Sequence, residues 1–226
     1  MSAICNERHA RHKAPASQIA REREVMKRIG LKTAPLAFLV MMAITGAAAA
    51  WDGLNVRNCT WCHGTSGQGY TVAPRLAGQR PAYIESQMRS FRDHTRDNPF
   101  SRQYMWGAVA ALDPWSARDL AAYFASIPPK PANDGDPGLM ARGRDIYMNG
   151  VPEANIASCY ACHGPNAEGV REIPRLGGLA YFYLKGRLDQ WGQGYHSGTG
   201  TPMPIVARAL GPDEIEALAS YLSFVR

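Results

Sequence analysis

Beyond residue 50, this 226-residue chain has almost no excess of charge of either sign. The formal net charge is +6, but eight basic and three acidic residues among the first fifty account for +5 of it. The other 17 basic and 16 acidic residues are nearly neutral as a group. Because proteins that bind polyphosphates usually carry a basic patch or stripe, this balance argues against nucleic acid as a partner.

The sequence also lacks runs of alternating apolar and polar residues, which would indicate β-strands. Cysteine is scarce: there are five in all, Cys5 and the two pairs Cys59/Cys62 and Cys159/Cys162. Glycine (22) and proline (16) are frequent, which suggests many turns. The absence of strand patterns, together with the helical patterns described below, predicts an all-α fold.

Long apolar runs are missing except near the start of the chain. Residues 33–50, "TAPLAFLVMMAITGAAAA", are uncharged, end in four alanines and follow the basic segment "MKRIGLK" that begins at Met26. This order predicts a secretory signal over residues 1–50 and export of the chain. An uncleaved membrane anchor is the alternative, since the run is about as long as a membrane span. Residues 1–25 fit neither interpretation, so we expect translation to begin at Met26.

Two copies of one motif stand a hundred residues apart, "NCTWCHG" at 58–64 and "SCYACHG" at 158–164. Cys-x-x-Cys-His is the attachment pattern of c-type haem. The two thiols can form thioethers to one porphyrin, and the next residue, His63 or His163, can bind its iron. A thioredoxin-like pair needs no histidine, structural zinc usually brings its pairs closer together, and disulfides would leave the histidines unexplained. The pattern predicts two covalently bound haem c groups.

The repeat extends beyond the motif. "PRLAG" at 74–78 corresponds to "PRLGG" at 174–178 with an offset of 100, and further on Met105 corresponds to Met203 with an offset of 98. The proline-rich segment "PPKPANDGDPG" separates the copies. We therefore predict a first domain over residues 51–127, a linker over 128–137 and a second domain over 138–226.

Local patterns within each copy are helical. We expect helices at 143–150, at 82–91 and 181–191, and at the end of each copy. The first closing helix should begin at Ser116, which forms a capping-box-like pattern with Asp119. The second should begin at Pro212, with acidic residues in its first turn.

The second axial ligand of each iron decides its function. An iron with a free coordination position can bind a substrate, whereas an iron whose positions are all filled only transfers electrons. Met105 and Met203 are the only methionines at equivalent positions of the repeat, so we predict them as the ligands. His94 and His196 are the competitors, but their offsets do not match, and we interpret them as surface loop residues.

The chain from residue 51 onward resembles the two-haem cytochrome c4 family, through "CTWCHG", "CYACHG", "PRLAG", "PRLGG" and the two methionines. The resemblance implies two class I cytochrome c domains and His63/Met105 and His163/Met203 as iron ligands. It further implies that the Pro74 and Pro174 carbonyls accept the imidazole N–H groups, and that Arg75 and Arg175 approach haem carboxylates. The longer segment before Cys159 departs from the first copy.

Electron transfer in the periplasm is the function that this resemblance implies. The donor would be a quinol–cytochrome c reductase or a dehydrogenase, and the acceptor a terminal oxidase. Alternatives are a cytochrome subunit of a dehydrogenase, such as a sulfide-oxidising flavocytochrome, a two-haem enzyme resembling thiosulfate dehydrogenase, or a membrane-tethered relay. Matched methionines argue against an enzyme, and the membrane could be reached through the leader or a partner.

Overall fold

The computed structural model describes residues 56–226. The chain divides into two units, Met1–Trp51 and Asp52–Arg226, and the described residues all belong to the second. The predicted signal segment and the start at Met26 lie outside them. Within residues 56–226 there are no β-strands, only the isolated bridges Val151–Ile156 and Val170–Ile173, so the predicted all-α fold is confirmed. No helix in this part of the chain is long and apolar enough to cross a membrane.

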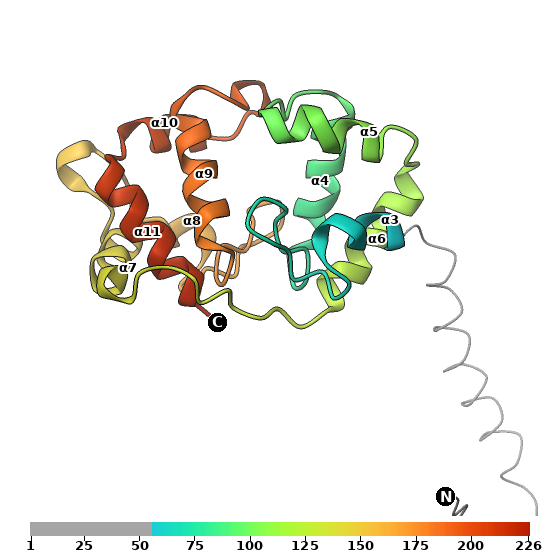
Figure 1. Ribbon diagram of the computed structural model, residues 1–226. Helices are drawn as coiled ribbons and strands as arrows, with labels where there is room; N and C mark the ends of the chain where they lie inside the picture. The colour runs from blue at the N-terminus through green and yellow to red at the C-terminus, as the bar shows by residue number, and fades with distance from the viewer. Residues whose placement is uncertain (1–55) are drawn as a thin grey trace, which may run out of the picture. The chain divides into compact units, whose positions relative to one another are not determined.

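Residues 56–127, here called the first half, form four α-helices and one π-helix (Figure 1). They are α3 (Val56–His63), α4 (Pro81–Arg92), the π-helix η1 (Ser101–Met105), α5 (Trp106–Val109) and α6 (Pro114–Ser126). Helices α4 and α6 pack together around a cluster of buried apolar side chains, Ile84, Leu120, Ala121 and Phe124. Burial of this cluster holds the helices in place beside the motif.

Residues 138–226, here called the second half, repeat this order with additions. The helices are α7 (Met140–Asn149), α8 (Tyr160–His163), α9 (Tyr181–Gly192), α10 (Met203–Ala209) and α11 (Pro212–Phe224). Short 3₁₀ turns lie at η2 (Pro137–Leu139), η3 (Pro152–Ala154) and η4 (Ser197–Thr199). Helix α11 packs against both α7 and α9, around a cluster that includes Ile146, Leu184, Leu218 and Leu222.

The two closing helices begin in different ways. The prediction that α6 starts at Ser116 was wrong, because Asp113 is its N-cap and Pro114 its first residue. The Asp113 carboxylate accepts the Trp115 and Ser116 backbone N–H groups at 2.9 and 3.0 Å, and proline suits a first position whose N–H would be unpaired anyway. Helix α11 starts at Pro212 as predicted, and the Glu214 carboxylate accepts the Gly211 N–H at 2.6 Å.

The halves also differ in how the chain reaches the motif. In the first half, α3 contains both cysteines and the histidine. In the second, α7 ends before Gly150, and η3 intervenes before the short helix α8 delivers His163. The Cys159 N–H donates to the Tyr147 carbonyl at 3.0 Å. This bond ties the longer approach back to α7.

Candidate haem sites

The four motif cysteines are free thiols. Cys59 and Cys159 are partly buried, whereas Cys62 and Cys162 are exposed. Burial raises the pKa of the Cys59 thiol and raises that of Cys159 to about 11. Residues three apart lie on the same side of a helical turn, so this spacing lets both thiols of a pair reach one ligand. Such a pair suits a ligand with two attachment points.

His63 and His163 are buried, each only 7% exposed. The Nδ1 atom of His63 lies 2.7 Å from the Pro74 carbonyl oxygen, and that of His163 lies 3.0 Å from the Pro174 oxygen. A carbonyl only accepts, so Nδ1 carries the proton and Nε2 keeps its lone pair for a metal. The structure thus brings together each histidine and the proline that the family resemblance pairs with it.

The electrostatic surroundings keep both imidazoles neutral. Burial lowers the pKa of each histidine, and the hydrogen bond to the proline carbonyl opposes this only in part. The charge of Arg96 lowers the pKa of His63 further. A neutral imidazole is the form that binds a metal.

The loop after each motif has the same backbone pattern in both halves. Gly69 donates its N–H to the His63 carbonyl and Gly169 to that of His163, both at 2.8 Å. Both glycines have positive φ, and a Cβ on Gly69 would lie 2.6 Å from the carbonyl carbon of Pro74. Only glycine therefore lets the chain approach Pro74 closely enough to fix its carbonyl beneath the histidine.

The two predicted methionines lie in the segments that follow α4 and α9. Met105 ends η1 and Met203 begins α10, and both are partly buried. Met203 also packs against the core of the second half. The histidine competitors have other partners: exposed His94 stacks on Trp106 with ring centroids 3.8 Å apart, and His196 belongs to a buried network described below.

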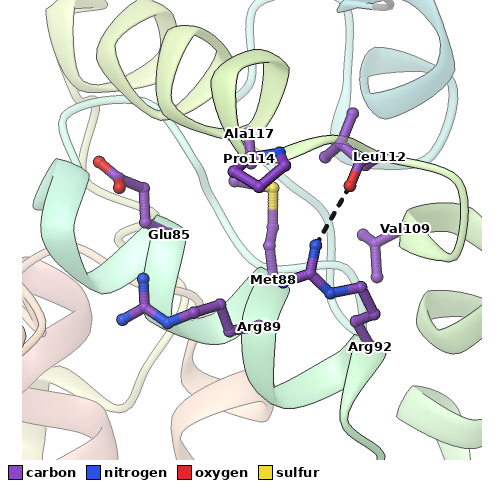
Figure 2. A pocket seen from close by; sticks show the side chains of 8 residues that line it. All are labelled: Glu85, Met88, Arg89, Arg92, Val109, Leu112, Pro114 and Ala117. Carbon is purple, nitrogen blue, oxygen red and sulfur yellow. Dashed lines mark hydrogen bonds between the residues drawn. The ribbon is translucent and has the colours of Figure 1, made fainter.

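A pocket of about 130 Å³ lies elsewhere in the first half, between α4 and the chain around α6 (Figure 2). Met88 reaches into it and also packs against the core of that half. Arg92 closes one side by donating to the Leu112 carbonyl at 3.3 Å. The pocket contains no residue of the two motifs, and Met88 fills apolar space there.

Arg75 connects the two halves through its guanidinium group. Its guanidinium donates to the carbonyls of Lys130, Gly178 and Gly177 at 2.7, 2.6 and 2.6 Å. Burial and the nearby Arg175 charge lower its pKa to about 10. These bonds use the two terminal nitrogens of the guanidinium and leave Nε buried without a partner among the described residues, and the contact of Arg75 with a haem carboxylate stays a prediction.

Gln79 makes a second connection to the same segment. Its side-chain amide donates to the Arg175 carbonyl at 2.9 Å and accepts the Arg175 N–H at 2.8 Å. The two bonds use the Arg175 backbone and leave its side chain uncommitted. The sequence analysis did not predict the hydrogen bonds of Arg75 and Gln79 to the second half, because no sequence pattern links these residues to partners so far along the chain.

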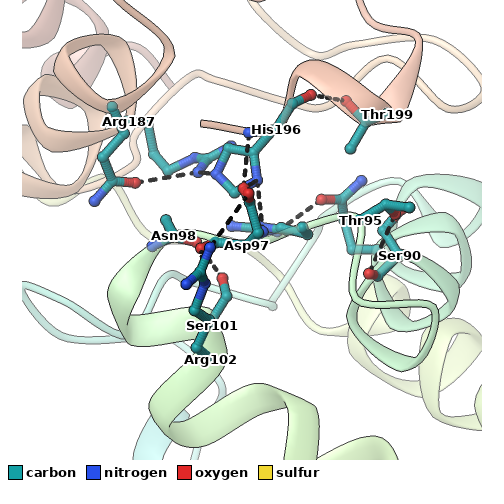
Figure 3. A network of polar contacts seen from close by, with 12 residues as sticks. Ser90, Thr95, Asp97, Asn98, Ser101, Arg102, Arg187, His196 and Thr199 are labelled. Carbon is teal, nitrogen blue, oxygen red and sulfur yellow. Dashed lines mark hydrogen bonds and ion pairs between the residues drawn. The ribbon is translucent and has the colours of Figure 1, made fainter. Parts of the chain in front are cut away.

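The sequence interpretation of His196 as a surface residue was wrong, since it is only 2% exposed. Figure 3 shows it within a polar network formed with Asp97 and Arg187. The Asp97 N–H donates to His196 Nδ1 at 3.2 Å, and the His196 N–H donates to the Asp97 carboxylate at 2.9 Å. This reciprocal pair joins the loops that follow α4 and α9. Burial, then the Arg187 and Arg96 charges, lower the pKa of His196 to about 2.

The donor sets fit haem. Each contains two free thiols one turn apart and, next in the chain, a buried neutral imidazole whose Nε2 is free to bind iron. A group with two attachment points beside a metal satisfies all three donors at once. The duplicated sites and the helical fold define a two-haem c-type cytochrome.

Comparison with known proteins identifies the family. Residues 140–225 match the family model described as "Cytochrome c". The chain is 32% identical over 201 residues to cytochrome c-552 of Acidithiobacillus ferridurans, covering 83% of this chain and 86% of that protein. It is 32% identical over 213 residues to a thiosulfate dehydrogenase electron acceptor of Stutzerimonas stutzeri, covering 84% and 94%.

A solved structure agrees with these sequence relatives. The cytochrome c4 structure from Acidithiobacillus ferrooxidans is 33% identical and matches with a TM-score of 0.67, covering 74% of this chain and 98% of that one. The chain belongs to the cytochrome c4 family. It holds two covalently bound haem c groups and transfers electrons.

Proposed function

We propose that this protein is a periplasmic electron carrier that accepts electrons from a dehydrogenase or a quinol–cytochrome c reductase and passes them towards a terminal oxidase. The observation that carries the proposal is the pair of matched sites, in which each histidine is held by a proline carbonyl in the same way. Two similar sites suit storage or relay of electrons. An exported chain meets such partners in the periplasm, in keeping with the signal pattern of residues 1–50.

We propose His63 with Met105, and His163 with Met203, as the axial ligands of the two irons. Cys59, Cys62, Cys159 and Cys162 would form the thioethers. Haem supplies an iron that changes between ferrous and ferric states, and a thioether ligand raises its potential. The protein residues orient the imidazoles and exclude water. If each histidine and methionine pair fills both axial positions, no position would remain open to a substrate, which favours a carrier over an enzyme.

The domain organisation follows from the same repeat. We propose a first domain over residues 51–127, a linker over 128–137 and a second domain over 138–226. Residues 127–136 lie in no helix, and the Arg75 and Gln79 bonds to the segment 175–178 connect the halves. Electrons would thus have a short route between domains that are held together.

Thiosulfate dehydrogenase is the dehydrogenase partner that the relatives favour. One similar protein is named as an electron acceptor of that enzyme. A subunit permanently bound to a dehydrogenase is the second candidate. A carrier and a permanent subunit differ in the lifetime of their complex with the dehydrogenase, since a carrier must dissociate after each electron transfer.

Stopped-flow mixing tests the proposal. The oxidised holoprotein is mixed with thiosulfate-reduced thiosulfate dehydrogenase, and then the reduced holoprotein is mixed with a haem–copper oxidase. We expect rapid haem reduction in the first mixture and rapid reoxidation in the second, with no stable complex on size exclusion. Failure of both transfers, or thiosulfate oxidation by the protein alone, contradicts the carrier role.

A further inference from the structure

One peptide unit of the second half is hydrogen-bonded at both of its polar atoms. Its carbonyl oxygen, which belongs to Pro174, lies 3.0 Å from Nδ1 of His163. Its N–H group, which belongs to Arg175, donates to the side-chain oxygen of Gln79 at 2.8 Å. Because Gln79 belongs to the first half, a single peptide unit joins a residue of one half to the proposed iron ligand of the other.

The Gln79 side chain is firmly held for this contact. It is only 6% exposed. Its amide oxygen also accepts the Arg80 N–H at 2.8 Å, and its amide nitrogen donates to the Arg175 carbonyl at 2.9 Å. A backbone N–H only donates and a carbonyl only accepts, so the three bonds fix which end of the amide faces each partner. Rotation of the side chain would leave buried polar groups unpaired, which is unfavourable.

The first half does not receive such a contact from the second. Position 179 is the equivalent of Gln79 at the offset of 100, and it is a leucine whose side chain belongs to the apolar core of the second half. A leucine side chain has no hydrogen-bonding atom, so it cannot accept the Arg75 N–H in return. Gly69 and Gly169, in contrast, lie against the corresponding peptide unit in both halves. Gln79 therefore makes two otherwise matched histidine sites unequal.

The two ends of the Pro174–Arg175 peptide unit are electronically coupled, because the peptide bond is conjugated. A hydrogen bond from its N–H group increases the negative charge on its carbonyl oxygen, which becomes a stronger acceptor for the imidazole proton. A stronger bond at Nδ1 makes His163 a more basic ligand. A more basic ligand gives more electron density to the iron and favours the ferric state. The Gln79 contact therefore supports the longer of the two histidine–proline bonds, 3.0 Å against 2.7 Å in the first half.

We propose that Gln79 is a positioning residue for the second haem, in which His163 is the histidine ligand. It holds the Pro174 carbonyl against the imidazole and lowers the potential of that haem. The potential of the second haem thus depends on the contact between the halves. The first haem has no equivalent dependence, because Leu179 offers no acceptor. The inference rests on the proposed role of His163 as an iron ligand, and not on the redox partner.

The test uses the haem-loaded full chain, with redox titration of both haems and NMR of the reduced protein. Gln79→Met keeps an unbranched side chain of similar length but removes its hydrogen bonds. We expect the reduced-to-oxidised ratio of the second haem to rise about threefold at a fixed potential, and that of the first haem to stay unchanged. The Nδ1–H resonance of His163 should move upfield and exchange faster with solvent, because its hydrogen bond is weaker.

Gln68→Met is the matched control. Gln68 also lies in the first half and also binds backbone at two points: it donates to the Pro128 carbonyl at 3.0 Å and accepts the Lys130 N–H at 2.9 Å. Neither of these backbone groups belongs to a peptide unit that contacts a motif histidine. Its substitution removes the same number of contacts to another segment and should leave the ratio of the second haem and the His163 resonance unchanged.

An unchanged ratio of the second haem in Gln79→Met, or an equal rise in Gln68→Met, would overturn the proposal. Gln79→Glu serves if Gln79→Met does not fold. Its carboxyl group still accepts the Arg175 N–H, so the ratio of the second haem should not rise, and a threefold rise there contradicts the role of the acceptor. A His163 ring without a haem ring-current shift would overturn the ligand assignment together with this proposal, whereas the other results would overturn this proposal alone.

Discussion

The Nδ1 atom of His63 lies 2.7 Å from the carbonyl oxygen of Pro74, eleven residues further along the chain. His163 and Pro174 repeat the relationship at 3.0 Å. A backbone carbonyl cannot be removed by mutating its own side chain, so the loop that positions it is the place to test its role. In both halves a glycine with positive φ lies against this carbonyl group.

Gly69→Ala should displace the Pro74 carbonyl from His63. The new Cβ would overlap the backbone of residues 73–75, and the positive φ is unfavourable for alanine, so we expect a loss of at least about 2 kcal/mol in unfolding free energy. A weaker hydrogen bond makes the imidazole less basic, which should raise the potential of the first haem only. Denaturant unfolding and redox titration measure the two effects.

Gly194→Ala is the matched control, because Gly194 also has positive φ but a methyl group added to it would have no neighbouring atom within 4 Å. Gly194→Ala therefore imposes the unfavourable positive φ on alanine without a steric overlap of the new Cβ. Equal effects of the two substitutions on haem potential would show that the Pro74 carbonyl is not what Gly69 protects.

Met105→Ala and Met203→Ala test the axial ligands separately. Each should open one iron, lower the potential of that haem and let it bind carbon monoxide, because the thioether that favours ferrous iron is gone. The near-infrared sulfur–iron band should fall by about half in each single variant, in proportion to the one site of two that is lost. Met88→Ala is the control within the first half. Survival of the band in the double variant would contradict the assignment.

Arg75→Met should weaken the connection between the halves. It removes the donors that Lys130, Gly177 and Gly178 use while keeping an unbranched side chain of similar length. Leaving these acceptors unpaired should lower the unfolding free energy by about 2–4 kcal/mol and speed proteolysis in residues 128–137.

Arg89→Met is the comparison for this prediction, since Arg89 also reaches across the halves. Its ion pair with Glu172, at 3.2 Å, is exposed on both sides. We expect its loss to change stability by less than about 1 kcal/mol. A larger loss of unfolding free energy in Arg89→Met than in Arg75→Met would mean that the exposed ion pair, and not the buried guanidinium, holds the halves together.

Asp113→Asn should make the first closing helix less sensitive to acid. The Ser116 hydroxyl and the backbone N–H groups lower the pKa of the Asp113 carboxyl. A lowered folded-state pKa contributes stability above the unfolded value, and that contribution is lost as the pH falls through the folded value. Amide exchange of α6 at decreasing pH should therefore accelerate more in the wild type than in Asp113→Asn. If amide exchange of α6 depends on pH in the same way in both proteins, the charge of the Asp113 carboxylate does not stabilise this helix start.

Much of the molecule could be predicted from local sequence signals. The doubled motif identified the haem sites because attachment chemistry requires two thiols and a histidine at fixed spacing. Helix α11 was predicted to its first residue, since Pro212 and the following acids mark a helix start directly. Helix α6 was misplaced by two residues, because Pro114 and the capping Asp113 were the stronger signal and Ser116 the weaker one.

The sequence by itself determined the cofactor of each half and the helices that follow each motif, because both depend on residues close in the chain. Only the tertiary structure decided how the halves join. Arg75 lies about a hundred residues from the Gly177 and Gly178 carbonyls that it binds, and Asp97 is as far from His196. No periodicity or fixed spacing in the sequence predicts such contacts. They arise because buried polar groups must find partners wherever the packed helices bring their loops together.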